Sequence, residues 1–385
     1  MMSSFLELLV RVEVDSLISS CPLVPEHIDQ EINVSVDPEL EYYREDSAPT
    51  GRFAIEALYS FSETERDVLT DVLSVPISPY RDYAGFQSAI QTIARSRVPG
   101  FLRDAVALAR TQDPATRPVL YLKNCPTGVV PVLDYEDPLN SKYERKTDFV
   151  AEAFLGVFTE LYGTAIVTYR SANRGDMFHD IHPMKKLAYS ITQKTVNTLH
   201  FHRDLPNNRV RPDWVYLLSL RNCPRNIVYT PVVRLKDIFE SLGPETLEVM
   251  RRPMFHAPLA VESNNISHYG VAGAGYTPAA PLLLEDRGHA SFAFHEGCTE
   301  STTAEGTLAI EQLRAVLHRE KYNLFLQERD FVAINNNTSM HARHVVKIDD
   351  IEAHQHRWLL KTWNVDNLED HRGCFMEGLI NTSDE

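Results

Sequence analysis

The stretch that decides the fold is Thr198-Leu199-His200-Phe201-His202-Arg203-Asp204, near the middle of the chain. Its alternation of apolar and polar residues predicts a β-strand, in which side chains two positions apart point to the same face. His200, His202 and Asp204 would then share one face, and the turn residues that follow at 205–208 predict a loop. Two imidazoles and a carboxylate suit iron(II), whose three-ligand site leaves positions open for substrate and oxygen. The residues alone also fit a strand-end histidine that is hydrogen-bonded to a neighbouring aspartate.

Two further pairs place a histidine and a carboxylate two positions apart, and neither predicts a metal site. His27 and Asp29 lie in an irregular acidic stretch after Pro25, where the histidine is expected to cap or line a loop. His318 and Glu320 lie at the end of a helix predicted over 308–318, with apolar residues at helical spacing. Residues two apart on a helix point about 200° away from each other, so they cannot bind one ion.

Support for a site at 202–204 comes from the C-terminal part of the chain. A strand predicted at 330–337 leads to His341, and Arg357 opens a second strand pattern that continues to 365. Each of these two residues alone has ordinary structural explanations. The order of a His-x-Asp pair, a distant histidine and then an arginine on a late strand is more informative than any one of them.

The sequence pattern changes from mainly helical to mainly strand-forming near Gly163. Before it, Ser62 and Glu65 form a capping-box pattern that predicts a helix start, and helical periodicity continues to Leu161 with a break at Pro99. After it, short buried strands are predicted at 165–169, 214–220, 227–229, 331–334 and 358–363. We expect an α+β, mainly β fold with a sandwich or barrel core and N-terminal and flanking helices. We expect one domain over 1–385, with a helix-rich part (1–162), the β core (163–365) and a C-terminal tail (366–385).

Composition excludes several classes of partner. The 385 residues include 38 basic and 53 acidic residues, so the formal net charge is −15 and there is no electrostatic footprint for nucleic acid or an anionic membrane. Five cysteines without a Cys-x-x-Cys pair argue for a reduced, intracellular protein and against a thiolate zinc site. No stretch approaches the roughly 18 apolar residues of a membrane span. We expect a cytoplasmic protein, and assembly into a homo-oligomer stays open.

Three stretches (177–183, 199–222 and 330–365) together resemble a known family. The sequence is similar to the iron(II)- and 2-oxoglutarate-dependent oxygenases of the clavaminate synthase and taurine dioxygenase group. Within this group it most resembles the free arginine and lysine hydroxylases of antibiotic biosynthesis. The resemblance implies a double-stranded β-helix (jelly roll) fold. It also implies hydroxylation of an unactivated side-chain carbon of a free, basic amino acid by O2, with 2-oxoglutarate converted to succinate and carbon dioxide.

Carried over position by position, the resemblance makes His202, Asp204 and His341 the iron ligands. It implies that Arg357 pairs with the distal carboxylate of 2-oxoglutarate, a bidentate task that suits a guanidinium better than an ammonium. Thr230 falls where the family places a hydroxyl on the same carboxylate. A carboxylate ligand at 204 argues against the related halogenases, which leave that position to chloride.

The resemblance also nominates residues that contact the substrate. Lys361 stands where several relatives have a second arginine that reaches the substrate carboxylate, and Ser171 lies near the place of a glutamine that contacts the substrate amine. From the residues themselves, Glu296 is preferred among the carboxylates of 281–305 as the partner of a distal ammonium or guanidinium, because Phe292 and Phe294 flank it, and His200 is expected in the pocket wall. The loop 205–211 is a predicted lid.

Several alternatives stay open at this point. His200 could replace Asp204 as a ligand in a cupin-type dioxygenase, and a jelly roll could bind a ligand without catalysis. The same site could perform desaturation, ring closure or taurine-type cleavage, or accept a carrier-tethered or sulfonate substrate. The residues His354 and His356 are expected at a solvated strand end.

Overall fold

The chain divides into two units, residues 1–41 and 42–385, and every residue described below belongs to the second. The computed structural model describes residues 53–190, 192–206, 208–257, 277–286 and 289–384. His27 and Asp29 lie outside the described residues, and a single domain over 1–385 stays a prediction.

Five α-helices lie within the described residues 53–162, where helical periodicity was predicted. Helix α2 (Glu63–Val72) begins at the predicted capping box, in which Glu65 N donates to Ser62 Oγ at 3.2 Å and Ser62 N donates to Glu65 Oε2 at 2.8 Å. The predicted break at Pro99 separates the next two helices, because this proline is the N-cap of the second of them. The helices after α2 are α3 (Tyr83–Ser96), α4 (Gly100–Arg110), α5 (Pro138–Arg145) and α6 (Val150–Tyr162).

Two β-sheets form the centre of the described unit. The strands of the eight-stranded sheet are β1 (Tyr59–Ser60), β2 (Val119–Lys123), β3 (Ala165–Tyr169), β4 (His179–Ile181), β6 (Trp214–Arg221), β13 (Phe331–Asn335), β15 (Trp358–Val365) and β16 (Thr382–Ser383). Their order is β1-β2-β13-β6-β15-β3-β16, and β4 also pairs with β15. The strands of the four-stranded sheet are β12 (Tyr322–Leu324), β7 (Ile227–Arg234), β14 (Ser339–Lys347) and β5 (Leu199–His202), in this order.

Alternation along the strands builds three separate apolar cores. Val232 of β7 packs with Leu217 of β6 and Leu359 of β15, so one core lies between the two sheets. On the outer face of the eight-stranded sheet, Leu360 packs with residues of α3, α4 and α6. Because Leu359 and Leu360 are adjacent on β15, they show directly how a strand buried on both faces supplies two cores.

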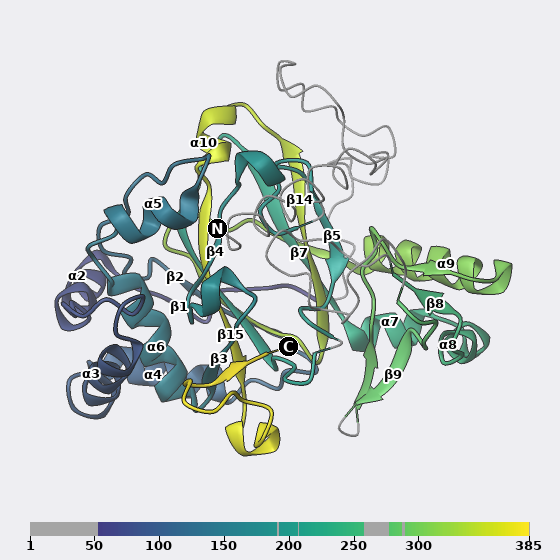
Figure 1. Cartoon of the computed structure of the whole chain (residues 1–385), viewed down its shortest axis with the longest axis horizontal. Helices are drawn as coiled ribbons and strands as arrows, with labels where there is room; N and C mark the ends of the chain where they lie inside the picture. The colour runs from purple at the N-terminus through teal and green to yellow at the C-terminus, as the bar shows by residue number, and fades with distance from the viewer. Residues whose placement is uncertain (1–52, 191, 207, 258–276, 287–288, 385) are drawn as a thin grey trace, which may run out of the picture. The chain divides into compact units, whose positions relative to one another are not determined.

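A second group of helices covers the outer face of the four-stranded sheet, where Val233 packs with their apolar residues (Figure 1). These are α7 (Leu235–Ser241), α8 (Pro244–Met250) and α9 (Ala304–Glu320). Two small strand pairs join them, β8 (Phe255–His256) with β11 (Glu300–Ser301), and β9 (Leu283–Asp286) with β10 (His289–Phe292). The remaining elements are η2 (Asn173–Gly175), η3 (Lys185–Leu187), α10 (Ile351–Gln355) and η4 (Leu368–His371).

The five predicted strands all exist, and the mixed α/β class is confirmed. Two local predictions differ from the structure. Helix α9 begins at Ala304 and not near 308, because Thr303 caps it by accepting a hydrogen bond from Gly306 N. The predicted solvated strand end at 354–356 is wrong, since Asp350 caps α10 and His354 is buried.

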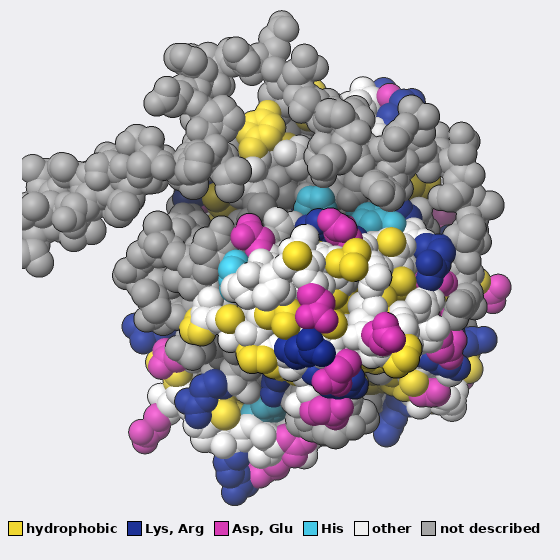
Figure 2. Space-filling view, turned by 90° about the vertical axis from the view of Figure 1, so that its right-hand side faces the viewer, with side chains coloured by type: hydrophobic (Ala, Val, Ile, Leu, Met, Phe, Trp, Pro, Cys, Tyr) yellow, Lys and Arg dark blue, Asp and Glu magenta, His cyan; other side chains and the backbone are white. Residues whose placement is uncertain are grey.

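The face that carries α8 and α9 has basic and acidic side chains side by side (Figure 2). Arg252 lies 3.1 Å from Glu305, and Arg251 lies 4.0 Å from Glu248. The net negative charge of the chain is therefore not gathered into a patch of one sign on this visible face. Among the described helices, none has both the length and the apolar character needed to span a bilayer.

Candidate metal centre

The structure brings the side chains of His202, Asp204 and His341 together. One ligand atom from each lies within 4.8 Å of the other two. His202 Nε2 is 3.2 Å and His341 Nε2 is 3.6 Å from Asp204 Oδ1, so both imidazoles face the same carboxylate oxygen. In the described part of the chain, this is the one group of three or more such residues that could hold an ion.

Strand register explains how residues far apart in the sequence meet here. β5 pairs with β14 in antiparallel fashion, and His202 stands directly opposite His341. Directly paired residues present their side chains to the same face of a sheet. His341 is also opposite Val232 of β7, whose side chain belongs to the core between the sheets. The site therefore faces the interior between the two sheets, at the end of β5.

The backbone of Asp204 is fixed by one buried side chain. Asp204 N donates to Asn336 Oδ1 at 3.0 Å, and Asn336 Nδ2 donates to Asp204 O and to Pro212 O, both at 2.9 Å. The following residue, Leu205, has a left-handed backbone conformation with φ of 51°. Leucine rarely adopts this conformation, so the chain turns sharply away just after the carboxylate.

The carboxylate itself is also held. Asp204 Oδ2 accepts hydrogen bonds from Trp363 Nε1 at 2.6 Å and from Lys361 Nζ at 3.2 Å. Burial alone would raise the pKa of Asp204, but the Lys361 charge and the hydrogen bonds with His202 and His341 lower it well below its usual value. The group is therefore ionised, which is the form that binds a metal.

The two histidines are prepared for the same role. His202 Nδ1 lies 2.8 Å from the backbone oxygen of His200, a contact that orients the ring so that Nε2 faces the site. Burial lowers the pKa of His341, which favours the neutral imidazole. Two imidazole nitrogens and one carboxylate oxygen converge, a donor set typical of non-heme iron(II) sites. The residues present thus fit a divalent iron ion.

The guanidinium of Arg357 is a second group that could bind a ligand. Its side chain is buried, and no described residue accepts a hydrogen bond from its guanidinium. Burial lowers its pKa to about 10. A buried guanidinium without an anion is costly, so this position suits an anionic ligand that brings its own carboxylate.

Thr230 is buried on β7 and stands opposite Leu324 of β12, whose side chain belongs to the core between the sheets. Thr230 therefore faces the same interior as His341. Ser171 lies in the turn after β3, and its hydroxyl is buried without a hydrogen-bond partner among the described residues. Roles of these two residues in binding the co-substrate or the substrate stay predictions.

Lys361 faces the interior from β15, opposite Leu217 of β6. Besides Asp204 Oδ2, its ammonium donates to Gln193 Oε1 at 2.6 Å. It is therefore attached to the metal-ligand group, and a contact with a substrate carboxylate would use its remaining N–H.

His200 is part of β5, and Glu296 lies beside this strand. Glu296 Oε2 accepts a hydrogen bond from Phe201 N at 3.1 Å, Glu296 Oε1 lies 2.5 Å from His318 Nε2, and His200 Nδ1 is 3.8 Å from the carboxylate. Burial raises the pKa of Glu296, but His318 and the backbone of Phe201 outweigh it and lower the pKa. His200 is absent from the three-residue group, where Asp204 stands instead. Glu296 is already engaged by protein donors, so any bond to substrate would add to these.

Sequence reasoning missed two residues of the site, Trp363 and Asn336. Trp363 follows Lys361 by two positions on a predicted strand, so alternation could have placed it on the same face. Nothing local to Asn336 indicates its contact with Asp204, because the two residues are 132 positions apart.

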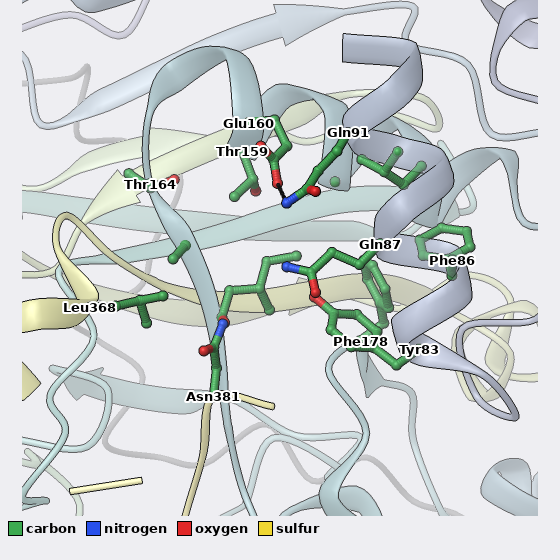
Figure 3. Close-up of a pocket in the computed structure, with 14 residues that line it drawn as sticks. Tyr83, Phe86, Gln87, Gln91, Thr159, Glu160, Thr164, Phe178, Leu368 and Asn381 are labelled. Atoms are coloured by element: carbon green, nitrogen blue, oxygen red, sulfur yellow. Dashed lines mark hydrogen bonds between the residues drawn. The ribbon is translucent and has the colours of Figure 1, made fainter. Parts of the chain in front are cut away.

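A separate cavity of about 160 Å³ lies on the outer side of the eight-stranded sheet, between α3, α6 and the start of β3 (Figure 3). Gln91 Nε2 donates to Glu160 Oε1 at 3.3 Å across its rim. None of the predicted site residues lines it. It is therefore distinct from the metal centre.

Comparison with known proteins supports a shared fold. The chain matches no protein-family model and no curated protein. Among solved structures it is similar to asparagine oxygenase in complex with Fe(II), 2S,3S-3-hydroxyasparagine and succinate, with a TM-score of 0.69 and 17% identity over 84% of this chain and 98% of that chain. It is also similar to the non-heme iron oxygenase OrfP in complex with Fe, succinate and (3S)-hydroxy-L-Arg, with a TM-score of 0.65 and 17% identity over 84% of this chain and 99% of that one. The chain thus has the fold of these two oxygenases.

Proposed function

We propose that the chain is an iron(II)- and 2-oxoglutarate-dependent dioxygenase with a jelly-roll core, which hydroxylates a side-chain carbon of a free amino acid, with lysine or arginine preferred. The observation that carries this proposal is the meeting of His202, Asp204 and His341 in the interior between the sheets. The buried guanidinium of Arg357, whose Nε has no hydrogen-bond partner among the described residues, supports a place for the co-substrate. Asparagine oxygenase and OrfP, which share the fold, were solved with hydroxylated amino acids.

Each group then has a defined task. His202, Asp204 and His341 would hold the iron, which when bound supplies the oxidative chemistry with O2 and 2-oxoglutarate. Arg357 would receive the distal carboxylate of 2-oxoglutarate with two parallel N–H donors, and Thr230 would add a hydroxyl. The apolar residues between the sheets exclude water from this interior, which strengthens the pairing of Arg357 with a carboxylate.

The substrate would lie near Lys361, Ser171, Glu296 and His200. Lys361 retains one N–H for a substrate carboxylate, and Ser171 has a buried hydroxyl without a partner among the described residues. OrfP in complex with a hydroxylated arginine supports a basic substrate, while asparagine oxygenase supports testing an amide side chain beside it.

An anaerobic titration tests the metal centre directly. Adding iron(II) and 2-oxoglutarate to the wild-type protein should give a weak visible charge-transfer band, and His341→Ala should remove it. His256→Ala is the matched control, since this half-buried histidine of β8 pairs with Glu300 away from the site. Absence of the band in wild type, or its survival in His341→Ala, would contradict the proposal.

A substrate screen tests the reaction. Succinate formation should be stimulated above the uncoupled rate by arginine or lysine among the proteinogenic amino acids, with a product heavier by one oxygen atom. Stimulation by asparagine alone would replace the basic substrate with an amide. A protein that shows the band but is stimulated by no free amino acid would favour a carrier-tethered substrate.

A further inference from the structure

The chain has three tryptophans, and each donates its indole N–H to an aspartate. Trp214 Nε1 lies 2.9 Å from Asp366 Oδ1, and Trp358 Nε1 lies 3.1 Å from Asp180 Oδ1. The third bond, from Trp363 to Asp204, is the shortest at 2.6 Å. It is also the one whose acceptor belongs to the proposed metal centre.

The two oxygens of Asp204 have different neighbours. Oδ2 accepts two hydrogen bonds, from Trp363 and Lys361, which occupies the two lone pairs of a carboxylate oxygen. Oδ1 faces the Nε2 atoms of His202 and His341. The donors on Oδ2 thus decide which oxygen of the carboxylate is presented to the imidazoles.

We propose that Trp363 is a positioning residue for metal binding, which holds Oδ2 of Asp204 so that Oδ1 is presented beside the His202 and His341 nitrogens. This inference rests on the metal site of the proposed function. It assigns Trp363 a role through Asp204 and no contact with substrate.

Trp363 is better suited to this task than Lys361 because its ring is buried and packed against two other rings. The indole is buried between His179, at a centroid distance of 4.3 Å, and Tyr169, at 5.1 Å in an edge-to-face arrangement. The ammonium of Lys361 lies over the same indole at 4.1 Å and divides its bonds between Asp204 and Gln193. The indole is therefore held by packing against two rings, whereas the ammonium of Lys361 is shared between two acceptors.

The test measures metal affinity of the full-length protein, without turnover. Cobalt(II) is titrated anaerobically by calorimetry and by its visible absorption, and iron(II) by calorimetry. Trp363→Phe keeps an aromatic ring and removes the N–H, and it should weaken binding by about 10- to 100-fold, as loss of a partner of a metal ligand does. Trp214→Phe, which removes the same kind of bond from Asp366, should leave the affinity within about twofold of wild type. Equal affinities of Trp363→Phe and wild type would overturn the inference.

A double-mutant cycle separates positioning from a general loss of packing. In an Asp204→Ala background, Trp363→Phe should have no further effect on cobalt(II) affinity, because its acceptor is gone. An equal weakening in both backgrounds would mean that the ring acts by packing alone and would overturn the inference.

Two further variants distinguish failure of the metal site from failure of the role of Trp363. If His341→Ala binds cobalt(II) as tightly as wild type, the metal site itself fails; if His341→Ala is weakened but Trp363→Phe is not, the inference alone fails. Should the phenylalanine variant not fold, 3-benzothienylalanine introduced at position 363 replaces the N–H by sulfur within a ring of the same shape. It should weaken binding in the same way, and wild-type affinity in this protein would overturn the inference.

Discussion

Two buried arginines near the interior of the fold are used in opposite ways. Arg343 on β14 donates to three backbone oxygens, those of Gln193, Thr195 and Asn197. The guanidinium of Arg357, just before β15, donates to none of the described residues. Both guanidiniums are buried, and burial lowers the pKa of Arg343 to about 9, with the charge of Arg357 adding to the effect.

The difference indicates that one arginine stabilises the fold and that the other is suited to bind a ligand. Arg343 ties residues 193–197 to β14, so the desolvation of its two terminal nitrogens is offset within the folded chain. Arg357 is buried, and its Nε has no acceptor among the described residues, an arrangement that costs stability in the free protein. Local violations of this kind are expected at functional sites, where a ligand completes the set of contacts.

The substitution Arg357→Met tests the role of this arginine and should have the largest effect. Its affinity for 2-oxoglutarate should fall by about 2–5 kcal/mol, the usual loss when one partner of a buried charge pair is removed. The free protein should be at least as stable as wild type, because an unpaired buried charge has gone. Calorimetric binding of 2-oxoglutarate to the cobalt(II)-loaded protein and a urea unfolding curve measure the two quantities. Wild-type affinity for 2-oxoglutarate would show that another cation binds it.

Arg343→Met is the matched change at the other arginine, and its effect should fall on stability. Three carbonyl oxygens lose their donor, so the free energy of unfolding should drop by about 3 kcal/mol at about 1 kcal/mol for each hydrogen bond. Urea denaturation measures it. A variant as stable as wild type, with weakened 2-oxoglutarate binding, would exchange the roles of the two arginines.

Local sequence patterns were sufficient to predict helices and strands, whose side chains follow a regular period. Alternation predicted β3 and β15 nearly to their ends, and the capping box placed the start of α2. Such patterns could not predict contacts between segments that are far apart in the sequence. Asn336 and Asp204 are 132 residues apart and Trp363 and Asp204 are 159 apart, and no local periodicity states that such residues meet.

The error at His354 has the same cause. Two histidines in a polar stretch after a strand pattern predict exposure, but Asp350 turns the chain into α10 and directs His354 inward. There His354 Nε2 donates to Val196 O at 2.7 Å. The partner that explains its burial lies 158 residues earlier.

The charges of both arginines act on His354, and its replacement should give the smallest of the predicted changes in stability. Burial lowers its pKa to about 4, and the charges of Arg357 and Arg343 contribute, although the bond to Val196 opposes them. The unfolded chain takes up a proton near pH 6.5, whereas the folded chain stays neutral until about pH 4. Because the unfolded state binds more protons in this window, stability is lost as the pH falls from 6.5 towards 4.

The change that tests this is His354→Gln, which keeps an N–H for Val196 and removes the titration. Between pH 7 and pH 5.5, wild type should lose about 1 kcal/mol more stability than the variant, from one proton at about 1.4 kcal/mol per pH unit. Urea unfolding at both pH values measures the difference, and Arg343→Met should reduce it by removing one of the charges that keep His354 neutral. Equal pH dependence of wild type and His354→Gln would mean that His354 is protonated at the same pH in the folded and unfolded chains, and that neither arginine acts on it.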